Sequence, residues 1–202
     1  MLESGNSARN LSDTELPPEM YDRSAPLKQD AAPEPVGHWF DGDRRRDLYL
    51  TGGLVAEVGP TEAGATRLRS LRPEAEEVAN AQSGVRLWNI EANTLDVVPE
   101  LSSTEGEGGF SPVFHEGAGE LAGRCALTGG IVVRFPRGTT DEQISAFLAE
   151  ENLAGERIGN LGTSWSIESE PGLASLELAN RLHELEITEY ASPNVWREVS
   201  TR

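Results

Sequence analysis

The chain has 202 residues, of which 34 are acidic and 17 basic, so its formal net charge is -17. So acidic a surface repels a phosphate backbone, and nucleic acid is therefore not expected as a partner. No apolar run approaches the roughly 20 residues that span a bilayer, so no membrane partner is expected either.

The first segment, residues 1–36, is predicted to be a disordered leader. It contains the proline-rich pieces ELPPEM, SAP and AAPEPV and few aromatic or β-branched residues, so it cannot bury enough surface to offset chain entropy. Its start has neither the basic residues nor the apolar stretch of a secretory signal. We therefore expect a cytoplasmic chain as given, or a secreted one if a signal has been removed.

The chain changes character at residue 38, where HWF precedes the turn sequence Asp41-Gly42-Asp43 and the run RRRDLYLTGGLVAEV. This order predicts a strand, a tight turn and a second strand.

An internal repeat is the most informative feature of the sequence. Residues 50–58 read LTGGLVAEV and residues 127–135 read LTGGIVVRF, an offset of 77. Further along, Ser111-Pro112 is repeated as Ser192-Pro193 at an offset of 81. Two matches in the same order at nearly equal offsets indicate two copies of one unit. We divide the chain into a first repeat at 37–118 and a second repeat at 119–202.

The second repeat is predicted in detail. Residues 131–135 form a β-branched strand, and Thr140 with Gln143 fits a capping box at the start of the amphipathic helix DEQISAFLAEENL. Strands follow at 155–161 and 163–168, then the helix LASLELANRLHEL and a last strand at 187–191 that Pro193 stops. The order is β-α-β-β-α-β.

The first repeat is predicted to follow the same order in a degenerate form. Its strands are placed at 54–58, 85–90 and 109–113, one helix near 62–71, and a weak second helix in ANTLDVVPELSSTEGEGG. The expected fold class is α+β, with two tandem ferredoxin-like units whose antiparallel sheets carry helices on one face. The sheet face without helices is expected to bind a partner.

No catalytic centre is predicted. The three histidines, His38, His115 and His183, are far apart, and none has a second ligand at metal-binding spacing. Cys125 is the only cysteine, so an intrachain disulfide and a cysteine-based zinc site are excluded, and a buried apolar role is expected. No nucleophile motif is present. We therefore expect a non-enzymatic protein without metal or cofactor.

The C-terminal segment, residues 194–202, is predicted to leave the sheet as an extended tail, because Pro193 favours an extended chain before it and ends the strand. An extended tail at a sheet edge has the right shape to enter a protease cleft and add main-chain hydrogen bonds there.

Three segments of the second repeat carry a family resemblance. GGIVVRFPRGTTDEQISAFLAEENL, TSWSIESEPGLASLELANRLHEL and ITEYASPNVW, within about 127–197, resemble the N-terminal propeptide of subtilisin-family serine proteases. The first repeat, which ends in FSPVFHEG, resembles the additional propeptide-like unit that precedes some of these proteases, of the fervidolysin type.

The resemblance implies an intramolecular chaperone and tight, temporary inhibitor whose sheet docks on the catalytic domain of a subtilisin-like serine protease. The implied protease-facing edge is Glu189, Tyr190, Ser192, Pro193 and Asn194, with Glu189 placed to cap enzyme helices. The implied tail in the substrate cleft is Val195, Trp196, Arg197, Glu198, Val199, Ser200, Thr201 and Arg202. If the protease cuts at the end of this chain, Arg202 is the P1 residue and Val199 the P4 residue.

Two alternatives stay open at the level of the sequence. The chain can be a separately encoded protease inhibitor rather than a cleaved propeptide. It can also be a tandem ferredoxin-like regulatory domain that binds a small ligand between its repeats, with Thr51-Gly52-Gly53 and Thr128-Gly129-Gly130 at the junctions.

Overall fold

The structure is a computed structural model that describes residues 33–59, 66–82, 84–117, 123–159 and 161–198. All of them belong to one compact body, Ala32–Arg202. Most of the predicted leader, residues 1–32, lies outside the described residues. Val36, the last residue of that leader, donates its backbone N–H to the Leu48 carbonyl at 2.8 Å and so already joins the sheet.

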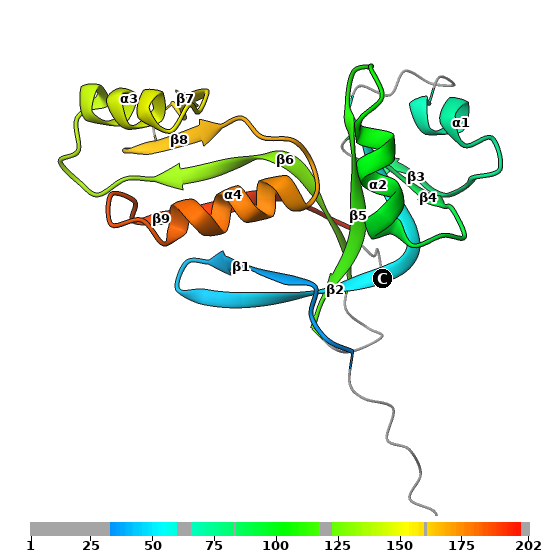
Figure 1. The fold of residues 1–202 in the computed structure, drawn as a ribbon. Coiled ribbons are helices and arrows are strands. Elements are labelled where there is room, and N and C mark those ends of the chain that lie inside the picture. Colours follow the sequence, from blue (N-terminus) through cyan, green and yellow to red (C-terminus); the bar gives the residue numbers. More distant parts are fainter. Residues whose placement is uncertain (1–32, 60–65, 83, 118–122, 160, 199–202) are drawn as a thin grey trace, which may run out of the picture. The chain divides into compact units, whose positions relative to one another are not determined.

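The described residues form an α+β structure in which the predicted order of elements occurs in both repeats (Figure 1). After an additional strand, β1 (Gly37–Asp41), the first repeat contains β2 (Arg44–Val58), α1 (Arg67–Leu71), β3 (Glu76–Gln82), β4 (Val85–Asn89), α2 (Thr94–Ser102) and β5 (Gly109–Glu116). The second repeat contains β6 (Arg124–Arg134), α3 (Asp141–Glu150), β7 (Gly155–Arg157), β8 (Ser164–Ile167), α4 (Leu173–His183) and β9 (Tyr190–Arg197). The α+β class is confirmed.

Several local predictions are confirmed. The strands β1 and β2 form a hairpin in which Asp41 pairs with Arg44, and Gly42 occupies the turn with φ 62°. At the start of α3 the Thr140 side chain accepts from the Gln143 N–H, and the Gln143 side chain accepts from the Thr140 N–H. This capping box satisfies two donors that a helix start leaves without partners.

The strand order is also the same in the two repeats. It runs β5-β2-β4-β3 in the first and β9-β6-β8-β7 in the second, and all the described pairs are antiparallel. In each repeat the first strand is long and pairs with the last strand along most of its length. Its register shifts at the LTGG sequence, between Leu50 and Val55 in β2 and between Leu127 and Ile131 in β6.

The two repeats are joined through β5 and β6. Val113 pairs with Ala126, Phe114 with Cys125 and His115 with Arg124, which makes one continuous nine-stranded sheet. The first half of β6 therefore lies between β5 on one edge and β9 on the other. This junction is the strand pairing that joins the two repeats.

Each repeat has a hydrophobic core between its sheet and its helices. In the first repeat Val55, Trp88 and Phe110 pack against residues of α1 and α2. In the second repeat, strand residues that include Ile131, Val133 and Trp165 pack against α3 and α4. The members are buried at every second strand position and every third or fourth helix position, as expected for half-buried elements.

A third core lies at the junction and takes residues from both repeats. We call it the junction core; its buried members are Trp39, Leu48, Phe114, Cys125, Leu127 and Leu176. The β1 strand also contacts α4 directly: the Asn180 side chain donates to the His38 carbonyl at 2.7 Å, and the Phe40 ring stacks on His183 at 4.1 Å. The N-terminal hairpin is thus part of the packing of the second repeat (Figure 1).

Several predicted strand boundaries are wrong. Strand β6 begins at Arg124 rather than at Ile131, β7 ends at Arg157 rather than near Leu161, and no residue range was predicted for β3. The last strand starts at Tyr190 and continues through Pro193 to Arg197 instead of ending at Ala191. Pro193 is tolerated because it lies opposite Ile131, at the register shift, where the hydrogen-bond ladder is interrupted.

Glu57 is a buried carboxylate that connects three elements of the first repeat. Glu57 is only 6% exposed. One oxygen accepts from the Leu68 backbone N–H at the start of α1 (3.1 Å), and the other accepts from Trp88 Nε1 on β4 (3.0 Å). The carboxylate therefore holds α1 against the sheet and satisfies two buried donors.

We expect Glu57→Ala to lower the free energy of unfolding by about 2–4 kcal/mol, because two buried N–H groups lose their acceptor. Glu57→Gln, which keeps one acceptor oxygen, should cost less. Urea unfolding followed by tryptophan fluorescence measures both. The matched control is Glu77→Ala, which removes an exposed glutamate from β3 and should change stability by less than about 0.5 kcal/mol. Equal midpoints for Glu57→Ala and the control would contradict this role.

Candidate functional site

The helix-free face of the second repeat carries serines beside a valine, an arginine and a tyrosine. Val132 pairs with Ser166 on one side and Ser192 on the other. These residues alternate with core residues such as Ile131 and Val133, so they project from the opposite face. One position along, Arg134 pairs with Ser164 and Tyr190. We call this set the sheet face: Val132, Arg134, Ser164, Ser166, Tyr190 and Ser192.

The corresponding face of the first repeat has a different character. It carries an apolar cluster whose buried members are Ala56, Val85, Leu87, Val113 and Ala126, with Trp196 of β9 packed against them. We call it the outer cluster. Leu87 is 1% exposed and Val113 is fully buried. Of the two sheet surfaces away from the helices, the second repeat's is the more polar and the more accessible.

The predicted protease-facing edge residues lie at the start of β9. Glu189 is exposed, and its backbone N–H donates to the Arg134 carbonyl at 2.9 Å. Tyr190 begins the strand, and Ser192 and Pro193 are buried within it. The Asn194 side chain donates to the Gly129 carbonyl at 3.1 Å, which fixes β9 against the register shift of β6. The structure brings these five residues together along one strand and its approach.

The predicted tail residues do not leave the sheet where expected. Val195, Trp196 and Arg197 pair with Leu127, Ala126 and Cys125 of β6, and the Glu198 N–H donates to the Arg124 carbonyl at 2.9 Å. The prediction of a free tail from Asn194 onward is therefore wrong up to Glu198. Val199, Ser200, Thr201 and the possible P1 residue Arg202 lie outside the described residues.

The glycines of the second LTGG sequence allow β9 to pack closely. Gly129 has φ 83° and Gly130 has φ 67°, in the left-handed region that favours glycine. A Cβ on Gly129 would lie 2.8 Å from the Ser169 carbonyl oxygen, and one on Gly130 would lie 2.9 Å from Asn194 Nδ2. The space beside Thr128-Gly129-Gly130, one of the junctions considered for a ligand, is filled by the chain itself.

Cys125 has the buried, inert character expected from the sequence. Burial raises the pKa of its thiol from 9.0 to about 12, and the Glu116 carboxylate adds to the rise. Below pH 9 the thiol is neutral in both the folded and the unfolded chain. Above pH 9 only the unfolded chain ionises, so the stability that the buried neutral thiol contributes is lost as the pH rises towards 12.

The histidines have structural contacts. The His183 ring stacks on Phe40, and its Nδ1 accepts from the Ala191 N–H at 3.4 Å. His115 Nδ1 lies 3.2 Å from the Thr51 hydroxyl. Within the described ranges, no three His, Cys, Asp or Glu side chains are grouped as metal ligands.

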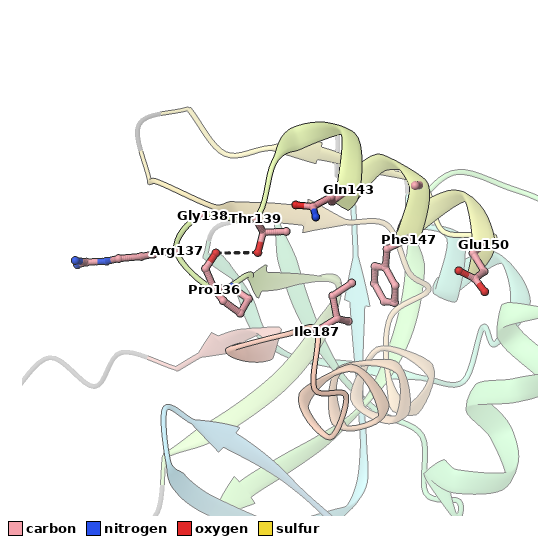
Figure 2. A pocket seen from close by; sticks show the side chains of 9 residues that line it. Pro136, Arg137, Gly138, Thr139, Gln143, Phe147, Glu150 and Ile187 are labelled. Carbon is pink, nitrogen blue, oxygen red and sulfur yellow. Dashed lines mark hydrogen bonds between the residues drawn. The ribbon is translucent and has the colours of Figure 1, made fainter.

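The described residues also form hollows outside the sheet face, two of which bear on function. Figure 2 shows an open depression of about 600 Å³ between the turn after β6 and α3, with Phe147 and Ile187 near its centre and Arg137 pointing away from it. At its wall the Thr139 hydroxyl donates to the Pro136 carbonyl at 2.9 Å. The second hollow, about 190 Å³, lies between the repeats and is lined by Leu95, Val98, Pro99, Ser102, Pro112, Glu170, Pro171, Leu173 and Ala174.

Comparisons with known proteins add no assignment. No family model, curated protein or solved structure matches the chain. No helix in the part of the chain that the structure describes is both long and apolar enough to cross a membrane.

The two LTGG sequences provide a matched test of how the register shift positions β9. We expect Gly129→Ala to lower the free energy of unfolding by about 2–4 kcal/mol, because it combines an unfavourable backbone conformation with a contact to the Ser169 carbonyl. Its repeat counterpart Gly52 has no positive φ, and a Cβ there meets no atom within 4 Å. Gly52→Ala should therefore leave stability unchanged or slightly higher. Thermal and urea unfolding of the two variants compare them directly, and equal losses would contradict the assignment.

Proposed function

We propose that the chain is a propeptide-like inhibitor and folding chaperone of a subtilisin-like serine protease, and that each repeat is a ferredoxin-like unit. The element order β-α-β-β-α-β and the antiparallel strand order in both repeats support the fold part of the proposal. The resemblance of residues 127–197 to subtilisin propeptides supports the functional part. In this proposal the chain binds and is not itself a catalyst.

The observation that carries the proposal is the accessible sheet face of the second repeat, bordered by the strand that leads to the C-terminal segment. On that face Arg134 is exposed, and Val132, Ser166 and Tyr190 are half-buried, so helices of a partner can pack across it. The exposed Glu189 lies at the end of that face, where its carboxylate suits the positive N-terminus of a partner helix. The segment after Glu198 then enters the substrate cleft as an added strand.

The described strand changes which residues are assigned to the cleft. Because Val195 to Arg197 pair with β6, the cleft-binding part of the predicted tail is reduced to Val199, Ser200, Thr201 and Arg202. Inhibition then depends on the sheet face for most of the buried area and on the last residues for product-like occupation of the cleft.

We expect the full chain to inhibit a subtilisin-type protease slowly and tightly, and a form that ends at Glu198 to lose at least tenfold in inhibition constant while its unfolding midpoint stays the same. The shortened form keeps all of β9, so a loss of inhibition cannot be attributed to a loss of fold. Hydrolysis of a chromogenic peptide at several inhibitor concentrations gives the inhibition constants. Equal inhibition by both forms would contradict the role of the tail.

The same assay tests the sheet face. Ser166→Arg places a long, charged side chain at its centre and should weaken inhibition at least tenfold. The matched control is Ser145→Arg, the same change on the exposed side of α3, which should have no effect. Equal effects of the two substitutions would mean that the protease docks elsewhere.

A small-ligand regulatory domain is the second candidate, and the hollow of about 190 Å³ between the repeats favours it. Its lining is mainly apolar and comes from α2 and from the segment that starts α4, so a ligand there would contact both repeats. A rise in melting temperature with amino acids that bear apolar side chains, abolished by Ala174→Leu, would support this candidate. Inhibition of a protease with no such rise would reject it.

A further inference from the structure

We infer that the first repeat positions the C-terminal segment, through a group made of Trp39, Glu116 and Arg197 that fixes the point where the chain leaves the sheet. We call this group the Arg197 cluster. The inference rests on the proposed function and assigns a role to the first repeat within it. Trp39 and Glu116 act here as positioning residues, since neither belongs to the segment that enters a cleft.

The side-chain contacts of Arg197 all lead to the first repeat. Its guanidinium donates to Glu116 at the end of β5 with an N–O distance of 2.8 Å. The same group lies over the Trp39 ring of β1, with its central carbon 5.3 Å from the ring centroid. One arginine of the second repeat is thus held by an ion pair to one strand of the first repeat and by a cation–π contact to another.

The backbone and the neighbouring side chains hold the same stretch. Glu198 donates its N–H to Arg124, and its carboxylate lies 3.7 Å from the Arg124 guanidinium. Val195 packs on the junction core, which contains Trp39, Leu48 and Phe114 of the first repeat. Trp196 packs on the outer cluster of the first repeat. Val195 and Trp196 thus pack on clusters made by both repeats, and Arg197 contacts the first repeat directly.

By holding the end of β9, these contacts affect how tightly the segment after Glu198 can bind. A tail that leaves a fixed point in a fixed direction has less freedom to lose when it enters a cleft, so it binds more tightly than a loose one. If the Arg197 cluster is broken, residues 195–198 separate from β6 more often and the segment after Glu198 starts from a wider range of positions. The sheet face is unaffected, because it belongs to the other half of β6 and β9.

The direct test is hydrogen exchange, followed by NMR, of the amides of residues 195–198 in the full chain. Arg197→Gln and Glu116→Gln should each speed their exchange about three- to tenfold, the scale of one partly exposed ion pair, while amides of α3 and α4 stay unchanged. The matched control is Arg181→Gln, which removes an equally exposed ion pair with Glu151 on the helical side of the second repeat. The double variant Glu116→Arg/Arg197→Glu re-forms the ion pair but not the Trp39 contact, so it should restore slow exchange in part.

A second probe uses the single cysteine. Cys125 pairs with Arg197 and is buried in the junction core, so a thiol reagent reaches it only when β9 opens or the chain unfolds. Labelling should be about three- to tenfold faster in Arg197→Gln than in Arg181→Gln under conditions where both are fully folded. Unchanged exchange and unchanged labelling in Arg197→Gln and Glu116→Gln would overturn the inference.

Inhibition constants of the same variants separate this inference from the proposed function. If the full chain inhibits a subtilisin-type protease, Arg197→Gln and Glu116→Gln should weaken inhibition by a factor similar to the change in exchange. The charge-swapped variant should recover part of the lost inhibition. Faster exchange with unchanged inhibition would overturn the positioning role. If the full chain inhibits no protease, the proposed function fails, while the exchange and labelling results still decide whether the first repeat holds the C-terminal segment.

Discussion

The pairing of β5 with β6 is the constraint on which the rest of the structure depends. It is short, with three residue pairs, yet it places the last strand of one repeat beside the first strand of the next. Because β9 occupies the other edge of β6, this pairing also brings Glu116 within reach of Arg197. The junction core then forms from residues of both repeats, including Phe114 and Cys125, which face each other across the pair.

The two repeats share one strand order but use their helix-free faces differently. In the first repeat that face is made of Ala56, Leu87 and Val113, which are buried, and the partly buried Trp196 packs against them. In the second, Val132, Ser166 and Tyr190 remain half-exposed. Since burial of apolar area is the main source of stability, the first face stabilises the chain itself, whereas the second is the face to which the proposed partner would bind. In that proposal the two repeats use one strand order for two purposes, one structural and one for binding.

The parts of the fold that the sequence predicts are those set by local signals. The hairpin turn at Gly42 and the capping box at Thr140 each depend on a few neighbouring residues, and both are confirmed. The second LTGG sequence, predicted as a turn before a strand, instead lies inside β6 at a register shift. The residue range of strand β3 is not predicted, because EEVANAQ has exposed side chains at 76–78 and no apolar alternation. The extension of β9 past Pro193 depends on a register shift opposite Ile131, which no local pattern around the proline reveals.

The same non-local pairing explains why the site differs from its prediction. The sequence of residues 194–202 contains no local signal for a strand. Only the position of β6 between β5 and β9 shows that residues 195–197 are paired. A second repeat without the first would lose Trp39, Leu48 and Phe114 from the junction core, which would expose Leu127 and Leu176. Small open-faced sheets have little burial to spare, so the cover is needed for folding as well. Completing the core and holding the end of β9 are two results of one contact, because both use the edge that β5 presents to β6.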